Sequence, residues 1–161
     1  RAGPSAWPVL EGGLDHASYE VRLGAIEAIG AGPHPRAVAL LDAFASDRDR
    51  ILNGRLLALR WIGRTGKSAA IGVLARFALG EEVGLRGPAI VALGGFRSPE
   101  AVDLLLSIAE RTGGSEREKT VEALRQITGT TRPGRSIEEW KRWWRLHRYR
   151  IVWEIEEGGP R

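Results

Sequence analysis

A six-residue apolar pattern that recurs at nearly equal intervals limits the possible folds of this chain more than any other feature. Three copies end in glycine and begin at Ala25, Ala58 and Ala89, and a looser fourth copy begins at Ala123. The four starts lie 33, 31 and 34 residues apart. A period of this length is typical of α-solenoids, in which each repeat is a helix pair that buries its apolar face against the next repeat. The sequence therefore predicts an all-α protein, a right-handed α-solenoid of about four helix pairs.

The composition fits one folded domain and excludes several kinds of site. The chain has 161 residues, of which 43% are hydrophobic and 27% are charged. No apolar run approaches the roughly 20 residues that cross a bilayer as a helix. Cysteine is absent, so disulfides, thiolate metal sites and cysteine nucleophiles are excluded.

Serine residues predict three helix starts. A serine side chain caps a helix by accepting a hydrogen bond from an amide of the first turn, which would otherwise lack a partner. The sequences that follow Ser98, Ser115 and Ser136 fit this role, because the first continues with proline and the other two fit capping boxes. We therefore expect a helix to begin after each of them.

Glycine and proline predict two further boundaries. Gly30 and Gly32 predict the end of the first repeat helix, because glycine readily adopts the left-handed conformation of helix C-termini. Pro88 is tolerated in a first helical turn but breaks a helix interior. The third repeat helix is therefore predicted to start near Leu85.

An arginine precedes three of the four repeats by three residues. These repeat arginines are Arg22, Arg55 and Arg86, and the fourth repeat has Thr120 at this position. Each shares a helix face with apolar residues, and a half-buried guanidinium needs a compensating partner. We interpret them as ion-pair partners that join neighbouring repeats, or alternatively as one wall of a concave groove that binds a partner or an anion. The candidate carboxylates are Asp15, Asp47, Asp49, Glu81 and Glu82.

The repeats resemble a known family. Residues 14–30 resemble a HEAT repeat in its short bacterial form, which phycobilin-lyase-type proteins share: an acidic residue is followed seven residues later by the repeat arginine. Residues 45–63 and 81–94 repeat the pattern, and residues 127–144 resemble the C-terminal cap of bacterial HEAT-repeat proteins. The resemblance implies HEAT-like helix pairs, a Trp-rich capping helix, and a scaffold or adaptor role. It also implies a second alternative, a lyase-like subunit for a cofactor or chromophore.

No group of residues predicts catalysis or metal binding. The stretch Gly63-Arg64-Thr65-Gly66-Lys67-Ser68 is similar to the end of a phosphate-binding loop, but position 61 is not glycine and no strand precedes it. His16, His34 and His147 lie in different repeats and lack metal-ligand spacing. We therefore expect no catalytic residue, no metal site and no cofactor.

Tryptophan and basic residues interleave near the C-terminus, where residues 132–150 hold seven basic and two acidic side chains. Helical spacing places Trp140, Trp143 and Trp144 on one face and most of the basic residues on another, which predicts a buried cap with a solvated outer side. Aromatic residues interleaved with cations also bind single-stranded nucleic acid, so a nucleic-acid interface is the alternative. Its candidate residues are Lys141, Arg142, Arg145 and Arg148.

The last residues change from a helical to a strand-like period. Tyr149, Ile151, Trp153 and Ile155 stand at every second position. The sequence thus predicts a repeat domain with its cap over residues 1–148 and an extended tail over residues 149–161. We expect this tail to dock through these four residues, either along the last helices or against something outside this chain.

A repeat array without a catalytic set predicts a non-enzymatic scaffold that binds another protein, as a module or subunit of a larger assembly. The chain contains no methionine, which fits either a processed mature chain or a piece of a longer protein. The location accordingly stays open between the bacterial cytoplasm and, for a processed chain, the cell envelope or periplasm.

Overall fold

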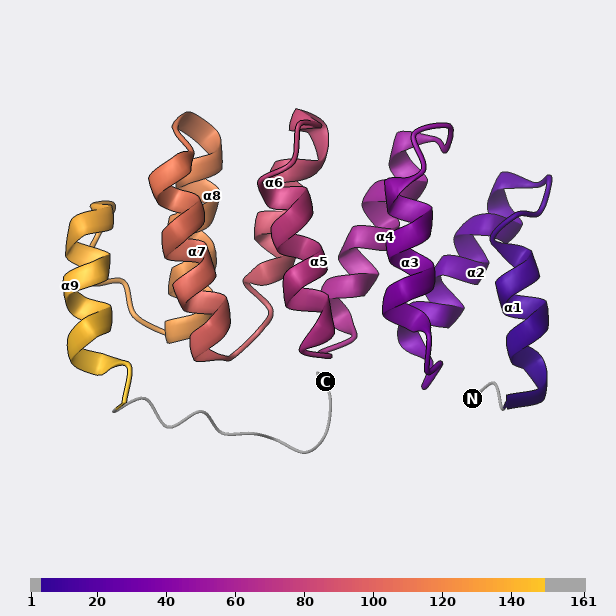
Figure 1. The fold of residues 1–161 in the computed structure, drawn as a ribbon, viewed down its shortest axis with the longest axis horizontal. Coiled ribbons are helices and arrows are strands. Elements are labelled where there is room, and N and C mark those ends of the chain that lie inside the picture. The colour runs from indigo at the N-terminus through magenta and orange to yellow at the C-terminus, as the bar shows by residue number, and fades with distance from the viewer. Residues whose placement is uncertain (1–3, 150–161) are drawn as a thin grey trace. The chain divides into compact units, whose positions relative to one another are not determined.

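The computed structural model describes residues 4–149, and every regular element in that range is helical. The predicted all-α class is confirmed for this part of the chain (Figure 1). The elements are η1 (Pro4–Ala6), α1 (Trp7–Gly13), α2 (Tyr19–Ala31), α3 (Ala37–Ser46), α4 (Leu52–Arg64), α5 (Ala69–Ala78), α6 (Val83–Leu93), α7 (Pro99–Arg111), α8 (Gly114–Thr128) and α9 (Ile137–His147).

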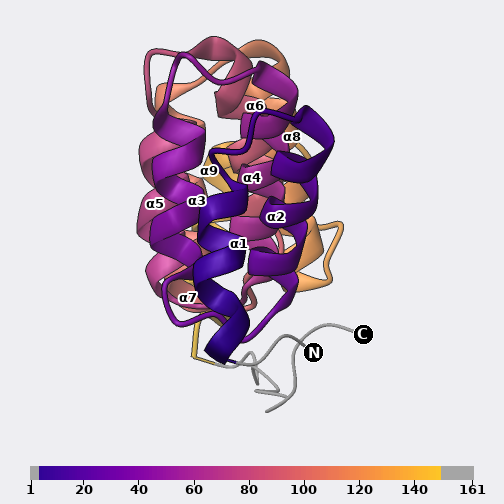
Figure 2. The same ribbon diagram turned by 90° about the vertical axis from the view of Figure 1, so that its right-hand side faces the viewer.

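The chain forms two compact units that divide after Val73. In the first unit α2 packs against α1, α3 and α4, and α3 also packs against α4; Figure 2 shows α1 and α2 side by side. In the second unit α8 packs against α6 and α7, and α9 packs against α7. Helix α5 begins in the first unit and ends in the second. Within each unit, the second helices of two consecutive pairs are therefore in direct contact.

The repeated apolar pattern supplies the same buried positions in all four copies. Its first, second and fifth residues lie on one face of α2, α4, α6 or α8, as the helical period of 3.6 residues requires. None of these side chains is more than 5% exposed. They are Ala25, Ile26, Ile29, Ala58, Leu59, Ile62, Ala89, Ile90, Leu93, Ala123, Leu124 and Ile127. The predicted core face of the repeats is therefore confirmed.

Gly30 has a different role from the one predicted. Helix α2 continues through Gly30 to Ala31, and Gly32 follows in an extended conformation with φ −91°, so the predicted left-handed ending is wrong. A Cβ atom added to Gly30 would lie 2.6 Å from the Cβ of Trp61 on α4. Gly30 is therefore the point of close approach between α2 and α4 within the first unit.

Gly94, at the end of the third copy, makes the corresponding approach in the second unit. A Cβ atom added there would lie 3.1 Å from the Cβ of Ala123 and 3.1 Å from Oε1 of Gln126 on α8. Gln126 and Trp61 both occupy the fourth position of their copies. The final glycine of one copy thus makes room for the next copy of the same unit.

Two predicted helix starts need correction. Helix α6 begins at Val83, so Pro88 lies inside the helix rather than in its first turn. Proline has no N–H, so the carbonyl of Gly84 lacks its helical donor. Gly84 is exposed, and water can donate to this carbonyl instead. Helix α8 begins at Gly114 and lacks a side-chain cap, so the predicted capping box at Ser115 is wrong.

The other two serine caps are confirmed. The Ser98 hydroxyl accepts a hydrogen bond from the backbone N–H of Ala101 at 3.2 Å at the start of α7. The Ser136 hydroxyl accepts from the N–H of Glu139 at 3.3 Å at the start of α9. Both caps satisfy first-turn amides that have no partner within the helix.

Candidate partner-binding site

The three repeat arginines share one contact, which is a hydrogen bond to a backbone carbonyl in the last turn of the preceding helix or in the turn that follows it. Nη1 of Arg22 donates to the carbonyls of His16 at 2.6 Å and Ala17 at 2.8 Å. Nε of Arg55 donates to Ala45 at 2.7 Å. The contact holds the turn that joins the two helices, and satisfies carbonyl groups that helix ends leave without a partner.

The third repeat arginine makes the same contact and adds an ion pair. Nε of Arg86 donates to the carbonyl of Gly80 at 2.6 Å. Its Nη1 lies 3.7 Å from Oε1 of Glu116 on α8. Glu116 was not among the carboxylates that the sequence suggested, because it lies 30 residues further along the chain.

A fourth arginine, which the sequence analysis missed, completes the series. Nε of Arg117 donates to the carbonyl of Thr112 at 3.0 Å. Arg117 stands 31 residues after Arg86, the same interval that separates Arg55 from Arg86. Thr120, at the position compared in the sequence, is buried and donates to the carbonyl of Glu116 within α8. The arginine has moved one turn towards the N-terminus, and a search by repeat interval would have found it.

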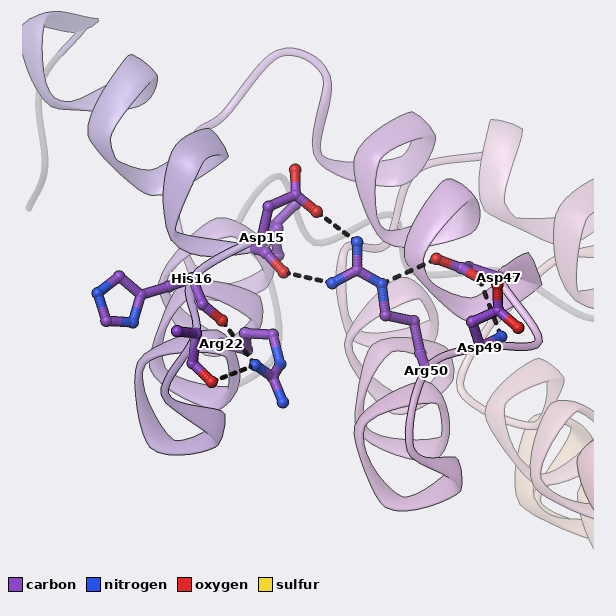
Figure 3. A network of polar contacts seen from close by, with 8 residues as sticks. Asp15, His16, Arg22, Asp47, Asp49 and Arg50 are labelled. Carbon is purple, nitrogen blue, oxygen red and sulfur yellow. Dashed lines mark hydrogen bonds and ion pairs between the residues drawn. The ribbon is translucent and has the colours of Figure 1, made fainter.

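A cluster around Arg50 lies beside Arg22 and links two turns of the first unit (Figure 3). Nη1 of Arg50 donates to the carbonyl of Leu14 at 2.9 Å, and Nη2 donates to the carboxylate of Asp15. Nε of Arg50 donates to Oδ2 of Asp47 at 2.9 Å. One guanidinium therefore joins the turn before α2 to the turn before α4, a link between residues 35 positions apart.

Hydrogen bonds within the cluster shift the pKa of Arg50 and the pKa of Asp47. Hydrogen bonding to Asp15, followed by that to Asp47, raises the pKa of Arg50 above its ordinary value. The hydrogen bond from Arg50, followed by that from the backbone N–H of Asp49, lowers the pKa of Asp47. Asp15 and Asp47, both suggested by sequence as partners of repeat arginines, are thus engaged by Arg50, which the sequence analysis did not single out.

A pocket of about 330 Å³ opens beside this cluster. Its apolar lining includes Phe44, which is 6% exposed, and Ile51, which is 55% exposed. Arg22 lines it from α2, with its guanidinium over the ring of Tyr19 at 5.6 Å. The full lining is Tyr19, Arg22, Phe44, Asp47, Asp49, Arg50 and Ile51, and we call this the Arg22 pocket.

A second pocket, of about 440 Å³, lies along α8 in the second unit. It contains Arg117, which is the counterpart of Arg22 in the fourth repeat, and two glutamates of the same helix, Glu118 and Glu122. Arg125 also lines it, and its Nη1 donates to Glu122 at 3.3 Å. Glu122 stands one helical turn before Arg125, so this acidic and this basic charge offset each other locally.

Two of the four residues proposed to bind nucleic acid make contacts that hold α9 against α7. Lys141 donates to the carboxylate of Glu110. Nη2 of Arg148 donates to Oδ2 of Asp103 at 2.6 Å, and Nε1 of Trp144 donates to Oδ1 of the same residue at 2.7 Å. The remaining pair, Arg142 and Arg145, is exposed.

Two of the three tryptophans of α9 are buried, and the third is partly exposed. Trp140 and Trp144 are buried, and Nε1 of Trp140 donates to the carbonyl of Gly134 at 3.1 Å. Trp143 is half-buried and stacks on His147 with 4.4 Å between ring centroids. Hydrogen bonding of both buried indoles removes the cost of burying their N–H groups.

The predicted tail docking residues lie almost entirely outside the described range. Tyr149 is described and is 91% exposed. Ile151, Trp153 and Ile155 are outside the described residues, so the predicted tail stays a prediction.

Within residues 4–149, no group of three or more histidine, aspartate or glutamate side chains is arranged to hold a metal ion. In the same range, no helix has the length and apolar character needed to cross a membrane. Comparison with protein-family models gives no match, and comparison with curated proteins gives no similar sequence.

Proposed function

We propose that this protein is a non-enzymatic scaffold or adaptor that binds another protein, built as a right-handed α-solenoid of HEAT-like helix pairs with α9 as its C-terminal cap. The observation that carries this proposal is the arginine-to-carbonyl contact, which recurs in all four helix pairs at intervals of 33, 31 and 31 residues. Recurrence of one tertiary contact at a fixed interval is what a stacked repeat architecture produces.

The solenoid arrangement has a direct test in solution. A compact globular chain of this length has a radius of gyration of about 15 Å. A stack of four helix pairs is elongated, so small-angle X-ray scattering should give a clearly larger value. A measured radius at the compact value would contradict the solenoid.

The Arg22 pocket supports a binding role in the first unit. It combines a fixed cation with exposed apolar surface at Ile51, and binding sites typically combine an apolar lining with a few well-placed polar groups. The experiment is photo-crosslinking with a benzophenone amino acid at position 51, and at position 9 of α1 as a control. Val9 is also apolar and exposed but does not line the pocket.

The scaffold proposal expects position 51 to capture the same protein from lysate in repeated experiments, in a band that excess unlabelled protein removes. Position 9 should capture that protein less well or not at all. Absence of a competed band at position 51 and at further exposed positions of α2, α4 and α8 would contradict a protein-binding function.

Nucleic-acid binding is the alternative function, and two exposed arginines of α9 support it. Arg142 and Arg145 are one helical turn apart, so they present two charges on one face. If they bind phosphates, mobility shifts of single-stranded DNA and RNA should weaken steeply with salt and disappear in the double variant Arg142→Glu/Arg145→Glu. Unchanged mobility at low salt would exclude this alternative.

A further inference from the structure

We infer that the Arg22 pocket binds the carboxylate of an acidic side chain in the partner protein, with an apolar neighbour of that residue seated on Ile51 and Tyr19. The inference rests on the proposed scaffold function and names the chemistry that the site selects. Four observations carry it: the anchoring of Arg22, the engagement of nearby acids elsewhere, the surroundings of the other repeat arginines, and the mixed lining of the pocket.

Arg22 is held in place by a single nitrogen. Nη1 donates to both the His16 and the Ala17 carbonyl, which uses the two hydrogens of that nitrogen (Figure 3). Nε and Nη2 have no hydrogen-bond partner among the described residues, and together they form the edge of a guanidinium that binds a carboxylate through two parallel hydrogen bonds. Because the side chain is already anchored, a ligand would not have to order it.

Three acids near Arg22 accept hydrogen bonds from other residues. Asp15 and Asp47 both accept hydrogen bonds from Arg50, and Glu20 accepts one from the Ser18 hydroxyl at 2.7 Å. Among the described residues no carboxylate lies within ion-pair distance of Arg22. Arg22 is thus a half-buried cation that makes no ion pair among the described residues. Its direct contacts are two backbone carbonyls and an aromatic ring, and Glu20 acts on it only as a nearby charge, so an incoming carboxylate would gain a full partner.

The other three arginines of the series lie in different surroundings. Arg55 is 5% exposed and lies inside the first unit. Arg86 has Glu116 at 3.7 Å, and the apolar side chain that lines the pocket of Arg117 is Val121, which is only 3% exposed. Arg22 is the member of the series that combines access, an open donor edge and an apolar wall.

The pocket lining also determines which partner residues can flank the acidic residue. Ile51 and Tyr19 favour an apolar neighbour, whereas Asp49 places a negative charge on the side of the α3–α4 turn. A second acid would meet that charge at close range and be disfavoured. The pocket volume, about 330 Å³, is at the small end of ligand sites and fits one side chain with part of its neighbour.

The test is a titration of the isotope-labelled full chain, followed by amide NMR, with acetyl-Leu-Glu-Leu-amide and its matched control acetyl-Leu-Gln-Leu-amide. The glutamate peptide should shift the amides of Tyr19, Arg22 and Ile51 in a saturable way. The glutamine peptide should bind about tenfold more weakly or worse, because it lacks the charge-assisted pair. Equal responses to the two peptides would overturn the inference.

Two variants sharpen the result. Arg22→Gln should remove the preference for glutamate, whereas Arg60→Gln, which removes an exposed charge of α4 that does not line the pocket, should retain it. Arg22 also holds a turn, so the amide spectrum of each variant must show an intact fold. If Arg22→Gln is unfolded, Arg22→Lys replaces it in the test. Lysine keeps the charge but lacks the two parallel N–H donors of the guanidinium. An undiminished preference for glutamate in Arg22→Lys would overturn the inference.

The two proposals fail separately. A partner crosslinked from position 51 without any glutamate preference would keep the scaffold and remove the carboxylate site. A glutamate preference without any crosslinked protein would keep the carboxylate site and remove the scaffold function.

Discussion

In the first unit Arg55 donates to the Ala45 carbonyl from a position that is 5% exposed, whereas in the second unit Arg117 donates to the Thr112 carbonyl from an exposed position. The geometry of the contact is conserved between the repeats, but the surroundings are not. A buried hydrogen bond is costly to lose because no water replaces the partner, and an exposed one is replaced by solvent. The repeat period therefore predicts which residues are in contact, and the burial of the contact determines how much it stabilises the fold.

The largest expected effect comes from breaking this contact in the two places. Arg55→Ala leaves the carbonyl of the fully buried Ala45 without its donor and removes a buried side chain, which should lower the free energy of unfolding by about 2–4 kcal/mol. Arg117→Ala exposes the Thr112 carbonyl to water and should cost less than about 1 kcal/mol. Urea unfolding followed by circular dichroism measures both. Equal losses would show that burial does not control the contribution of this contact.

Alanine substitution of the two glycines at close helix contacts should give the next largest loss of stability. Gly30→Ala places a methyl group 2.6 Å from the Cβ of Trp61, which cannot move without shifting α4, so the loss should be about 1–3 kcal/mol. Gly94→Ala should cost less, because its nearest contacts lie at 3.1 Å and one of them is the flexible end of Gln126.

Gly24 provides the matched control for these two variants, since it lies in the same helix as Gly30 and a Cβ atom there would meet nothing within 4 Å. Gly24→Ala should stabilise α2 by up to about 1 kcal/mol through helix propensity alone. If Gly30→Ala behaved like Gly24→Ala in thermal unfolding, the close approach of α2 and α4 would not be the reason for the glycine.

The same comparison explains what could be predicted from sequence. The buried face of each repeat is a local pattern with a period of 3.6 residues, so it is visible within one helix, as are the caps at Ser98 and Ser136. Gly30 was misread because a glycine near a helix end fits both a terminator and a point of close packing, and only the position of Trp61 separates the two.

The Arg22 pocket was the harder part to predict. Arg22 itself was identified, because it recurs with the repeat. The pairing of Arg50 with Asp15 joins residues 35 positions apart in two turns, and no periodic signal marks it. Because Arg50 engages Asp15 as well as Asp47, Arg22 makes no ion pair with either acid, and the part of this that depends on the contact with Asp15 cannot be read from the sequence.

The smallest expected effect is a pH dependence of the free energy of unfolding that arises from the Arg50 cluster. Arg50 and the N–H of Asp49 hold the pKa of Asp47 below its ordinary value of 3.8. A carboxyl group whose pKa is lower in the folded chain stabilises the fold at pH values above its unfolded pKa, and this contribution is lost as the pH falls through the folded pKa. Stability should therefore fall on acidification below pH 3.8, and Asp47→Asn should make that fall shallower.

Asp49→Asn is the control for this pH effect, because it removes a carboxylate from the same turn and retains Asp47 with both of its donors. Urea unfolding at a series of pH values should give the wild-type slope for Asp49→Asn and a reduced slope for Asp47→Asn. The difference should be modest, since exposed ion pairs contribute little. Identical slopes in all three proteins would mean that Arg50 joins the two turns through the Leu14 carbonyl and Asp15, with no contribution from Asp47.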